Sequence, residues 1–429
     1  MDCLPLIRNK RADAYEAHIP GSKSFTNRAL ILAAHRLGRT TIHHALICDD
    51  TCLLAKALDA FGGLHVEQHA DSFVVERTSE RLTAPELPLF MGGAGTPARL
   101  ILAFASGVEG ETLVTGNARL SERPMQDILK TLGDIGIRYE CLKLSGCLPV
   151  RIQGGKIRKS DWQVNGSVSS QFLTSLLIHA SQQSQFASLD VRVKGHLVSE
   201  PYVNMTLSMM NSVGLRAEKV AQGHYRVYPG AVSCRDIRVE VDASGMSYLL
   251  AAAVLTQSTV RVPGIDLASA QGDVGLLRIF EQMGCELREE DNAVVLTGKP
   301  LSGLEVDMEI MPDVVLTLAV VATQAAGPVT ISNIANLRIK ECDRIAACCA
   351  ELKRLGVRVD EGEDWLRVYP ADAFTPASIH CYDDHRVAMA FSLLGLIAPG
   401  ISVAEPACVS KSFPGYWAEM QRFIDFHAA

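Results

Sequence analysis

The sequence lacks any apolar stretch approaching the ~20 residues that are needed to span a bilayer. The first 21 residues also lack the apolar core of a secretory signal. No basic block stands out, and the formal net charge of -7 argues against general affinity for nucleic acid. We therefore expect a cytoplasmic protein without a membrane or nucleic-acid partner.

No two cysteines have the CxxC spacing of zinc and redox motifs, although the chain contains 12 cysteines. We interpret them as reduced, mostly buried small apolar side chains and expect no metal site. A Pro/Gly/Ser-rich linker and low-complexity tracts are also missing, so any domains should be closely connected. A chain of 429 residues, 48% of them hydrophobic, is long enough to bury two cores.

What the sequence does contain is a pattern that recurs six times. Small or polar residues precede a run rich in Leu, Ala and Val, at intervals of 71, 74, 76, 69 and 72 residues: Gly21, Gly92, Gly166, Asp242, Met311 and Asp383. Each copy continues with a β-branched strand and an amphipathic helix; five of these helices are closed by glycine, and five copies end in a hairpin pattern. The sequence predicts six repeats of helix, strand, helix and hairpin in two domains of three.

In the first repeat, residues suited to binding anions stand at a helix start. A Pro-Gly turn delivers Lys23 and Ser24 to the start of an apolar helix, and Arg28 lies one turn inside it. Unpaired N–H groups at such an end attract phosphate or carboxylate, but a serine cap and a basic first turn are common in ordinary helices. Asp49 and Asp50 precede the next helix, and we interpret them as capping acids.

The second and third repeats begin with polar groups of a different kind. Closely spaced glycines at 92–95 let backbone N–H groups approach an anion, although the strand-GxGxxG-helix setting of a dinucleotide site is missing. Arg123 stands just before a proline that should begin a helix. Residues 166–171, GSVSSQ, offer uncharged donors to a phosphate, or two of the serines act as helix caps.

The fifth and sixth repeats hold the densest grouping of residues suited to chemistry, whereas the start of the fourth, at Asp242, has no nearby base and is interpreted as structural. Asp313 lies at a helix start, and an alternating strand over 336–340 would place Asn336, Arg338 and Lys340 on one side. A charge run is commonly a solvated face, yet these charges recur at element junctions. Helix starts that converge on one cleft would bind a ligand with several anionic groups.

Nine motifs in order, from about Pro20 to Pro414, resemble the 5-enolpyruvylshikimate-3-phosphate synthase family: PGSKSxxxR, GxAGTxxR, RPM, GSVSSQFLTSLL, SxPY, DAS..SY, NxxxKExDR, DDHRxAMAFSL and KSFP. The resemblance implies an α/β protein with two inside-out α/β barrel domains, built from six pseudo-repeats, three per domain. By analogy, residues 1–20 and 241–429 form a discontinuous domain, residues 21–240 an inserted one, and the active site lies in the cleft between them.

The implied reaction transfers the carboxyvinyl group of phosphoenolpyruvate to the 5-hydroxyl of shikimate 3-phosphate and releases phosphate. It belongs to the shikimate pathway, which leads to chorismate and the aromatic amino acids. The two substrates are the only partners implied, and the reaction requires no cofactor or metal because lysines and arginines neutralise the phosphates and carboxylates. We expect a monomer.

The resemblance also implies roles for individual residues. Asp313 and Glu341 are the candidate acid–base carboxylates, with Lys23 as a possible acid beside the leaving phosphate. The implied shikimate 3-phosphate ligands are Lys23, Ser24, Arg28, Ser169, Ser170, Gln171, Ser199, Tyr202, Asp313, Asn336 and Lys340. The implied phosphoenolpyruvate ligands are Lys23, Gly95, Arg123, Gln171, Arg344, Arg386 and Lys411.

Three positions depart from the family pattern and keep alternatives open. Gly93 stands where asparagine is usual, Pro97 replaces a small residue, and Glu200 stands where a base is common. A transferase with another acceptor alcohol is one alternative, and a catalytically silent metabolite-binding or protein-binding relative is another. The sister transferase that acts on UDP-N-acetylglucosamine is disfavoured, since its reactive cysteine has no counterpart between Gly92 and Cys141.

Overall fold

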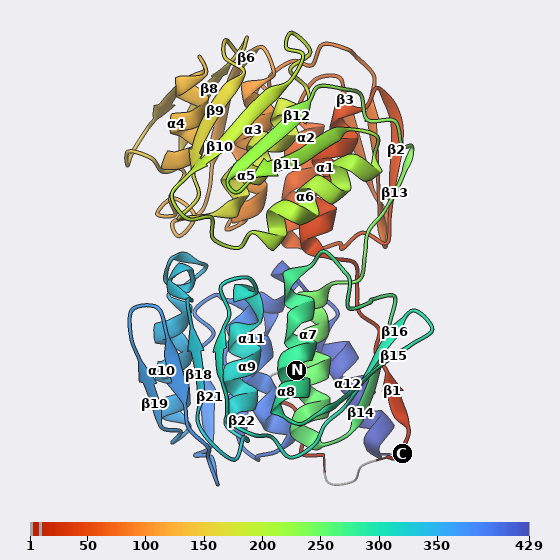
Figure 1. Ribbon diagram of the computed structural model, residues 1–429, viewed down its shortest axis with the longest axis vertical. Coiled ribbons are helices and arrows are strands. Elements are labelled where there is room, and N and C mark those ends of the chain that lie inside the picture. Colours follow the sequence, from red (N-terminus) through yellow and green to blue (C-terminus); the bar gives the residue numbers. More distant parts are fainter. Residues whose placement is uncertain (1–2, 8–10, 429) are drawn as a thin grey trace. The chain divides into compact units, whose positions relative to one another are not determined.

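The computed structural model describes residues 3–7 and 11–428, which fold as two compact units. Gly21–Val239 forms one, which we name the inserted unit, and Met1–Pro20 with Glu240–Ala429 forms the other, the discontinuous unit. Both combine helices with sheets (Figure 1), so the expected α/β class is confirmed. Among the described residues, no helix has both the length and the apolar character of a membrane span.

The inserted unit contains six helices and three four-stranded sheets. Its helices are α1 (Lys23–His35), α2 (Asp49–Asp59), α3 (Gly95–Ser106), α4 (Gln126–Asp134), α5 (Ser170–Ala180) and α6 (Pro201–Ser212). Its strands are β2 (Gly38–His43), β3 (Leu64–Gln68), β4 (Ser72–Arg77), β5 (Leu89–Phe90), β6 (Gly110–Thr115), β7 (Arg138–Cys141), β8 (Val150–Gly154), β9 (Asp161–Asn165), β10 (Leu189–Lys194), β11 (Arg216–Ala221), β12 (His224–Tyr228) and β13 (Asp236–Arg238).

The discontinuous unit has α-helices and short 3₁₀-helices, the latter labelled η. They are α7 (Ala243–Thr256), η1 (Gly272–Val274), α8 (Gly275–Met283), η2 (Pro312–Val314), α9 (Val315–Ala322), η3 (Ala335–Ile339), α10 (Arg344–Arg354), α11 (His385–Ser392), η4 (Leu393–Leu396), η5 (Pro406–Lys411) and α12 (Tyr416–Ala428). The strands are β1 (Ala14–Glu16), β14 (Thr259–Pro263), β15 (Glu286–Glu290), β16 (Ala293–Thr297), β17 (Glu305–Asp307), β18 (Val329–Ser332), β19 (Val359–Glu361), β20 (Leu366–Val368), β21 (Ala377–Ile379) and β22 (Ile401–Val403).

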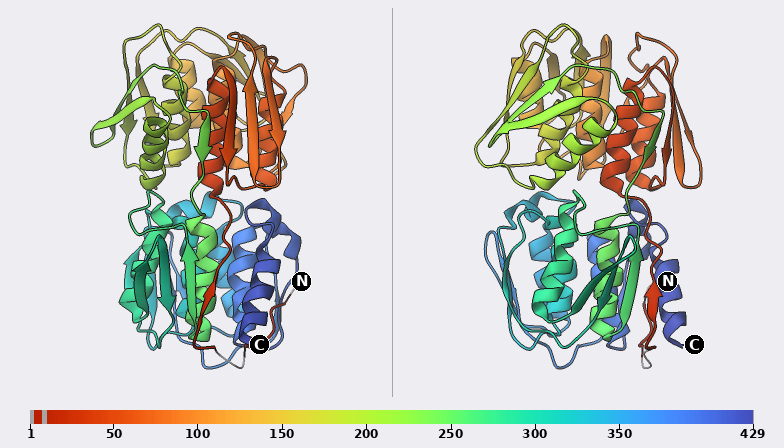
Figure 2. Two further views of the ribbon diagram at one scale, coloured as in Figure 1. Left: turned by 90° about the vertical axis from the view of Figure 1, so that its right-hand side faces the viewer. Right: turned by 45° about the vertical axis from the view of Figure 1, so that its right-hand side comes forward.

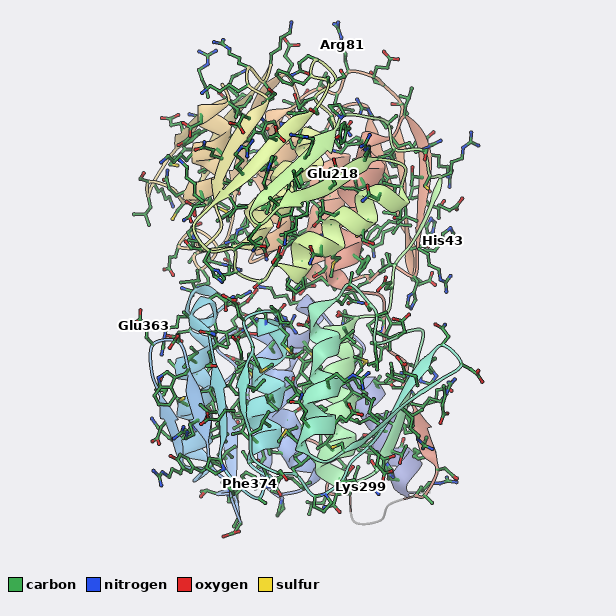
Figure 3. The ribbon with its side chains drawn as sticks, viewed as in Figure 1. His43, Arg81, Glu218, Lys299, Glu363 and Phe374 are labelled. Carbon is green, nitrogen blue, oxygen red and sulfur yellow. The ribbon has the colours of Figure 1, made fainter. Side chains whose placement is uncertain are left out.

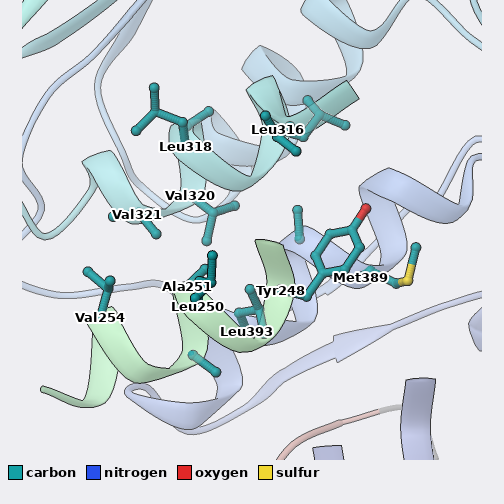
Figure 4. Close-up of a cluster of buried hydrophobic side chains, with 14 of the residues drawn as sticks. Tyr248, Leu250, Ala251, Val254, Leu316, Leu318, Val320, Val321, Met389 and Leu393 are labelled. Carbon is teal, nitrogen blue, oxygen red and sulfur yellow. The ribbon is translucent and has the colours of Figure 1, made fainter. Parts of the chain in front are cut away.

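The apolar run at the start of each repeat forms a helix that is buried along nearly its whole length. In the inserted unit these helices are α1, α3 and α5, and α3 packs closely on α5. In the discontinuous unit α7, α9 and α11 pack together, and Figure 4 shows Val254, Val320 and Met389 among the side chains between them. A helix that is apolar on all sides is stable only in such an interior.

The sheets share one topology, in which each repeat completes the sheet of the next. A strand that ends one repeat pairs in parallel with the first strand of the following repeat, as β5 pairs with β6 and β17 with β18. The hairpin of that following repeat then adds two antiparallel strands, giving orders such as β5-β6-β8-β7. In the sixth repeat only the parallel pair of β21 and β22 forms, in agreement with the five hairpins predicted.

The sheets that begin each unit obtain their extra strand from far along the chain. In the inserted unit β13 pairs with β2, which joins the third repeat to the first. In the discontinuous unit β1 pairs with β14, so the N-terminal segment completes the sheet of the fourth repeat. Figure 2 shows β1 running beside α12, where the Tyr15 hydroxyl donates to Glu419 Oε1 over 2.9 Å. Both chain ends are therefore tied into one unit.

Polar side chains occupy the outward faces of the hairpin strands, as Glu218 on β11 illustrates (Figure 3).

The cysteines are all free, as predicted, but fewer of them are buried than the sequence suggested. Of the 12, five are buried, six are half-buried and Cys3 is exposed. Half-burial is common here because many cysteines lie on strand ends and loops rather than on the helices of the core.

The strand expected over 336–340 is wrong. After β18, Asn333 adopts a left-handed conformation with φ 59°, and the chain turns into η3. Ile334 and Leu337, three residues apart, are both buried, which is the spacing of a helical turn rather than of a strand. Arg338 consequently points to Asp343, with Nη1 2.8 Å from Oδ2, whereas Lys340 reaches Asp313.

Candidate active site

In the discontinuous unit, Arg344 lies at the centre of a charged cluster. It begins α10, and Asp343 caps that helix by accepting from the Ala346 N–H. Its Nε donates to Asp384 Oδ2 over 2.7 Å, Nη1 to Asp313 Oδ1 over 3.1 Å, and Nη2 to Glu341 Oε2 over 2.8 Å. The side chain is 2% exposed, so a guanidinium fork fixed by three carboxylates is buried here.

Electrostatics keep this buried guanidinium charged. Burial lowers the pKa of Arg344, but the negative charges of Asp384 and Glu341 outweigh burial and raise the pKa above its ordinary value. Asp384 is itself fully buried and caps α11 by accepting from the Arg386 N–H over 2.9 Å. Asp384 therefore couples the start of α11 to the orientation of Arg344.

Asp313 joins three cationic groups. It lies in η2, at the helix start predicted from sequence, and its Oδ2 accepts from Arg386 Nη2 over 2.8 Å. Lys340 Nζ lies 3.8 Å from Asp313 Oδ1. On its other side Arg386 is 3.5 Å from the hydroxyl of Tyr248, a residue of α7.

Glu341 connects the same cluster to the end of the chain. Its Oε1 lies 3.3 Å from Lys411 Nζ, and its Oε2 accepts from Arg344. Lys411 ends η5, and both side chains of the pair are largely buried. The structure thus brings together six of the predicted residues, which are Asp313, Lys340, Glu341, Arg344, Arg386 and Lys411, with Asn336 on the adjoining η3.

A second acid lies near Asp313. Asp273, in η1, is 3% exposed, and its Oδ2 accepts a hydrogen bond from Ser244 Oγ near the start of α7. Burial, followed by the nearby charge of Asp313, raises the pKa of Asp273 to about 7. The start of the fourth repeat, interpreted from sequence as structural, therefore lies next to this cluster, through Ser244 and through Tyr248.

In the inserted unit, Lys23 is held by an acid rather than exposed at a bare helix start. Its Nζ lies 3.2 Å from Asp50 Oδ2, and the two side chains are 15% and 5% exposed. Asp50 is in the first turn of α2, where Cys48 holds the N-cap position. The sequence interpretation of Asp50 as only a capping acid was therefore incomplete, because the partner comes from another helix.

Arg28 is fixed by uncharged acceptors within the inserted unit. Its Nε donates to Thr206 Oγ1 over 2.8 Å, Nη1 to the Ser24 carbonyl over 2.9 Å, and Nη2 to the Tyr202 carbonyl over 2.9 Å. The residue is 1% exposed, and burial lowers its pKa to about 10. A buried cation surrounded by hydroxyls and carbonyls favours an anionic partner.

Gly95 and Arg123 meet at the start of α3. A Cβ on Gly95 would lie 2.6 Å from Arg123 Nη1 and 2.7 Å from its Cζ, so only glycine lets the guanidinium approach this backbone. Arg123 is buried, and its neighbour Pro124 accepts from Arg99 Nη2 over 3.2 Å. Arg99 Nη1 also donates to Gln171 Oε1 over 2.5 Å, which orients that amide.

The predicted serines lie at the starts of α5 and α6. Ser169 caps α5 by accepting from the Gln171 N–H over 3.3 Å, as one of the sequence alternatives expected, and Ser170 is the first residue of that helix. Ser199 has φ 55°, a left-handed conformation that directs the chain into α6. The next residue, Glu200, pairs with Lys219 Nζ at 2.5 Å and accepts from the Tyr225 hydroxyl at 3.2 Å.

The structure adds residues to which the sequence assigned no part in binding or catalysis: Asp50, Arg99, Ser244, Tyr248, Asp273 and Asp384. Asp273 alone lacked any sequence signal, because Asp50 was interpreted as a capping acid and the others stand within the motifs GxAGTxxR, DAS..SY and DDHRxAMAFSL. Each of the two sets presents cations that are oriented by buried neighbours, which is the chemistry needed to bind phosphates and carboxylates. In the described part of the chain no group of three or more His, Cys, Asp or Glu residues could hold a metal.

Comparison with known proteins identifies the family of this chain. A sequence model of the family described as EPSP synthase (3-phosphoshikimate 1-carboxyvinyltransferase) matches residues 14–420. The chain belongs to the EPSP synthase family. The 3-phosphoshikimate 1-carboxyvinyltransferase of Edwardsiella ictaluri is 38% identical over 408 residues, which cover 94% of this chain and 95% of the relative. Family membership confirms the resemblance drawn from the nine motifs.

Solved structures agree at the level of the fold. The EPSP synthase of Acinetobacter baumannii has a TM-score of 0.81 and 24% identity, covering 98% of this chain and 97% of that chain. The enolpyruvyl transferase NikO from Streptomyces tendae has a TM-score of 0.77 and 16% identity, covering 98% and 96%. Both likenesses concern the fold alone, which therefore occurs in proteins with different names.

Proposed function

We propose that this chain transfers the carboxyvinyl group of phosphoenolpyruvate to the 5-hydroxyl of shikimate 3-phosphate, and so serves the shikimate pathway to chorismate and aromatic amino acids. The substrate oxygen bonds to C2 of phosphoenolpyruvate while C3 gains a proton. The tetrahedral adduct then loses phosphate from C2 and a proton from C3, leaving an enol ether. Membership of the family supports this reaction.

The observation that carries the proposal is the grouping of Lys340, Arg344, Arg386 and Lys411 around Asp313 and Glu341. Four cations on three separate segments are held in place by carboxylates, so the cations are already gathered where an anion would bind. A solvated charged face would instead show exposed, loosely paired side chains.

Phosphoenolpyruvate would use residues from both units. Its carboxylate would bind Arg344 and Arg386, and there it competes with Asp313 for guanidinium N–H groups while Asp384 keeps Arg344 Nε in place. Lys23, Gly95, Arg123, Gln171 and Lys411 would bind its phosphate or line that subsite. The close approach of Arg123 to Gly95 supports a shared anion subsite, because a backbone N–H and a guanidinium then lie together.

Shikimate 3-phosphate would be held mainly by hydroxyl and amide groups. Ser169, Ser170 and Ser199 would bind its phosphate, and Ser24 and Arg28 its carboxylate. Gln171 and Tyr202 would shape the subsite, with Lys23, Asp313, Asn336 and Lys340 as further ligands. Burial of Arg28 among uncharged acceptors supports its part, since an arriving carboxylate would supply the opposite charge.

Asp313 and Glu341 would act as the general acid–base residues. Asp313 would take the proton of the 5-hydroxyl, and Glu341, bridged between Arg344 and Lys411, would exchange the proton at C3. Lys23 would donate to the leaving phosphate, and Asp50 would hold its ammonium in place. No metal or cofactor enters this scheme.

The expected domains, oligomeric state and location belong to the same proposal. The two units would be the two domains, each an inside-out α/β barrel of three pseudo-repeats, and the three buried helices in each unit support this. The protein would act as a monomer in the cytoplasm. The matched parallel-antiparallel order of the sheets supports six pseudo-repeats.

The test is phosphate release by the purified protein. With phosphoenolpyruvate and shikimate 3-phosphate together, we expect turnover and an enol-ether product detectable by mass spectrometry. Omission of either substrate should abolish phosphate release. Arg386→Gln should lose most kcat/KM for phosphoenolpyruvate, about 100-fold or more, because one carboxylate clamp is removed. A folded protein that releases no phosphate with both substrates would contradict the proposal.

A second candidate is the same transfer to a different alcohol. It is favoured by Glu200, whose carboxylate is neutralised by Lys219 beside the serines proposed to bind phosphate, and by the lack of a side chain at Gly93. Turnover of phosphoenolpyruvate with another alcohol, and not with shikimate 3-phosphate, would establish it. Phosphoenolpyruvate binding without any turnover would instead indicate a silent relative.

A further inference from the structure

Asp273 is a buried acid to which the proposed reaction gives no part. One carboxylate oxygen, Oδ2, accepts from Ser244 Oγ. The other, Oδ1, is buried and has no hydrogen-bond partner among the residues that the structure describes. An ionised carboxylate in such a position would leave one oxygen both desolvated and unpaired, which is costly, whereas a protonated carboxyl tolerates it far better.

The surroundings of Asp273 connect it to the charged cluster. Its 3₁₀-helix, η1, packs against α7, α8 and η2, and η2 carries Asp313. The charges that act on Asp273 are those of Asp242 at the start of α7, Asp313 on η2 and Arg386 on α11. The charged residues of α8, Arg278 and Glu281, pair with each other on its exposed side.

We infer that Asp273 is a positioning residue that acts through Arg386 and Asp313: protonated, it leaves their ion pair undisturbed, and ionised, it weakens the binding of phosphoenolpyruvate. This inference rests on the proposed function. The physical reason is that a second negative charge near Asp313 interacts with Arg386 and lowers the positive potential that an incoming carboxylate meets.

The balance between these two forms falls within the working range of an enzyme. With the pKa of Asp273 raised to about 7 by burial and by Asp313, the protonated form predominates below that pH and the ionised form above it. Because the two acids interact, the titration belongs to the pair rather than to Asp273 alone.

The experiment compares wild type with Asp273→Asn, in which an amide imitates the protonated carboxyl. Between about pH 6 and about pH 8.5, the KM of wild type for phosphoenolpyruvate should rise about threefold to tenfold more than that of the variant. The kcat of the two proteins should stay within about threefold at the acidic end. Ionisation of the substrate phosphate affects both proteins equally and cancels.

A second variant should shift the pH at which KM rises rather than abolish the rise. Ser244→Ala deletes a donor that favours the ionised carboxylate, so the rise in KM should occur at higher pH. Parallel KM profiles for wild type and Asp273→Asn would overturn the inference. Loss of activity in a folded Asp273→Asn protein at all pH values would also overturn it, because the ionised form would then be required.

An infrared difference measurement separates this inference from the proposed function, since it needs no substrate. Wild type should show a protonated-carboxyl C=O band that disappears as the pH is raised through the range of the KM change, and Asp273→Asn should lack that change. Identical spectra would overturn the inference even if the enzyme turns over. If wild type releases no phosphate, the proposed function fails while this measurement still reports on Asp273.

Discussion

Lys23 and Asp50 form an ion pair between the two helices of the first repeat, with Nζ 3.2 Å from Oδ2. Both side chains are largely buried, so the pair is not a loosely held surface bridge. The acid fixes the ammonium near the N-terminus of α1, the helix end that attracts anions. The position of the ammonium, and not only its charge, is therefore determined by a residue outside the proposed substrate ligands.

We predict that Asp50→Asn lowers kcat/KM about tenfold, because Lys23 keeps its charge but loses its anchor. The measurement is steady-state kinetics at several phosphoenolpyruvate concentrations. Asp49→Asn, at the exposed neighbouring position of the same helical turn, is the matched control and should stay near wild type. Equal effects of the two substitutions would show that Asp50 acts only as a first-turn acid.

Asp313→Ala should reduce turnover about 100-fold or more while the protein remains folded. The carboxylate is 20% exposed and joins Lys340, Arg344 and Arg386, so its loss disturbs charges rather than apolar packing. Turnover is measured by phosphate release and stability by urea unfolding. Asp307→Ala, at an exposed site on β17 at the end of the preceding repeat, serves as the control. Near-normal turnover of Asp313→Ala would remove this residue from the mechanism.

Gly95→Ala should raise the KM for phosphoenolpyruvate about tenfold or more, with a smaller change in kcat. The added methyl group would stand less than 3 Å from three atoms of the Arg123 guanidinium, so that buried cation must shift. Gly155→Ala is the control, because a Cβ there meets nothing within 4 Å. Unchanged phosphoenolpyruvate kinetics in Gly95→Ala would exclude Arg123 as a ligand.

His179 should make the inserted unit sensitive to acid. Burial lowers its pKa to about 4. The imidazole packs at a tilt against Trp162, and its Nε2 lies 3.3 Å from Ser106 Oγ. The unfolded chain binds a proton at this residue below about pH 6.5, and the folded chain does so only near the lowered pKa. Stability that is present at neutral pH is therefore lost as the pH falls through this window, by up to ~3 kcal/mol.

The check is urea unfolding of wild type and His179→Gln at several pH values between about 4 and 7. The variant should lose less stability on acidification, whatever its stability at neutral pH. His65→Gln, at an exposed site, should follow the wild-type slope. A variant whose stability falls as steeply as that of wild type would show that other groups cause the acid sensitivity.

Much of the fold could be predicted from the sequence, because its signals are local and repeated. The six apolar runs became buried helices, and the closing glycines adopt the left-handed conformation that ends a helix, as Gly284 does with φ 119°. The segment 336–340 was misread because its charges suggested alternation. What decided its conformation was the burial of Ile334 and Leu337, which depends on the packing of other elements.

The candidate site was predicted only where a motif marked it. Arg344, Arg386 and Lys411 carried both charge and a family motif, and they do gather with Asp313 and Glu341. Asp273 stands in no family motif, and the role that we infer for it depends on contacts between segments 29 or more residues apart. A single sequence does not record which acids become neighbours, so residues that act through others were missed.

The pairing of β1 with β14 has a consequence for how the protein is made. On the ribosome the first strand emerges long before its partner, whereas Gly21–Val239 already contains every strand of its own sheets. The inserted unit can thus fold during translation, whereas β1 stays unpaired until β14 has been synthesised. A polypeptide missing its first 20 residues would expose the edge of β14, an open template for intermolecular association.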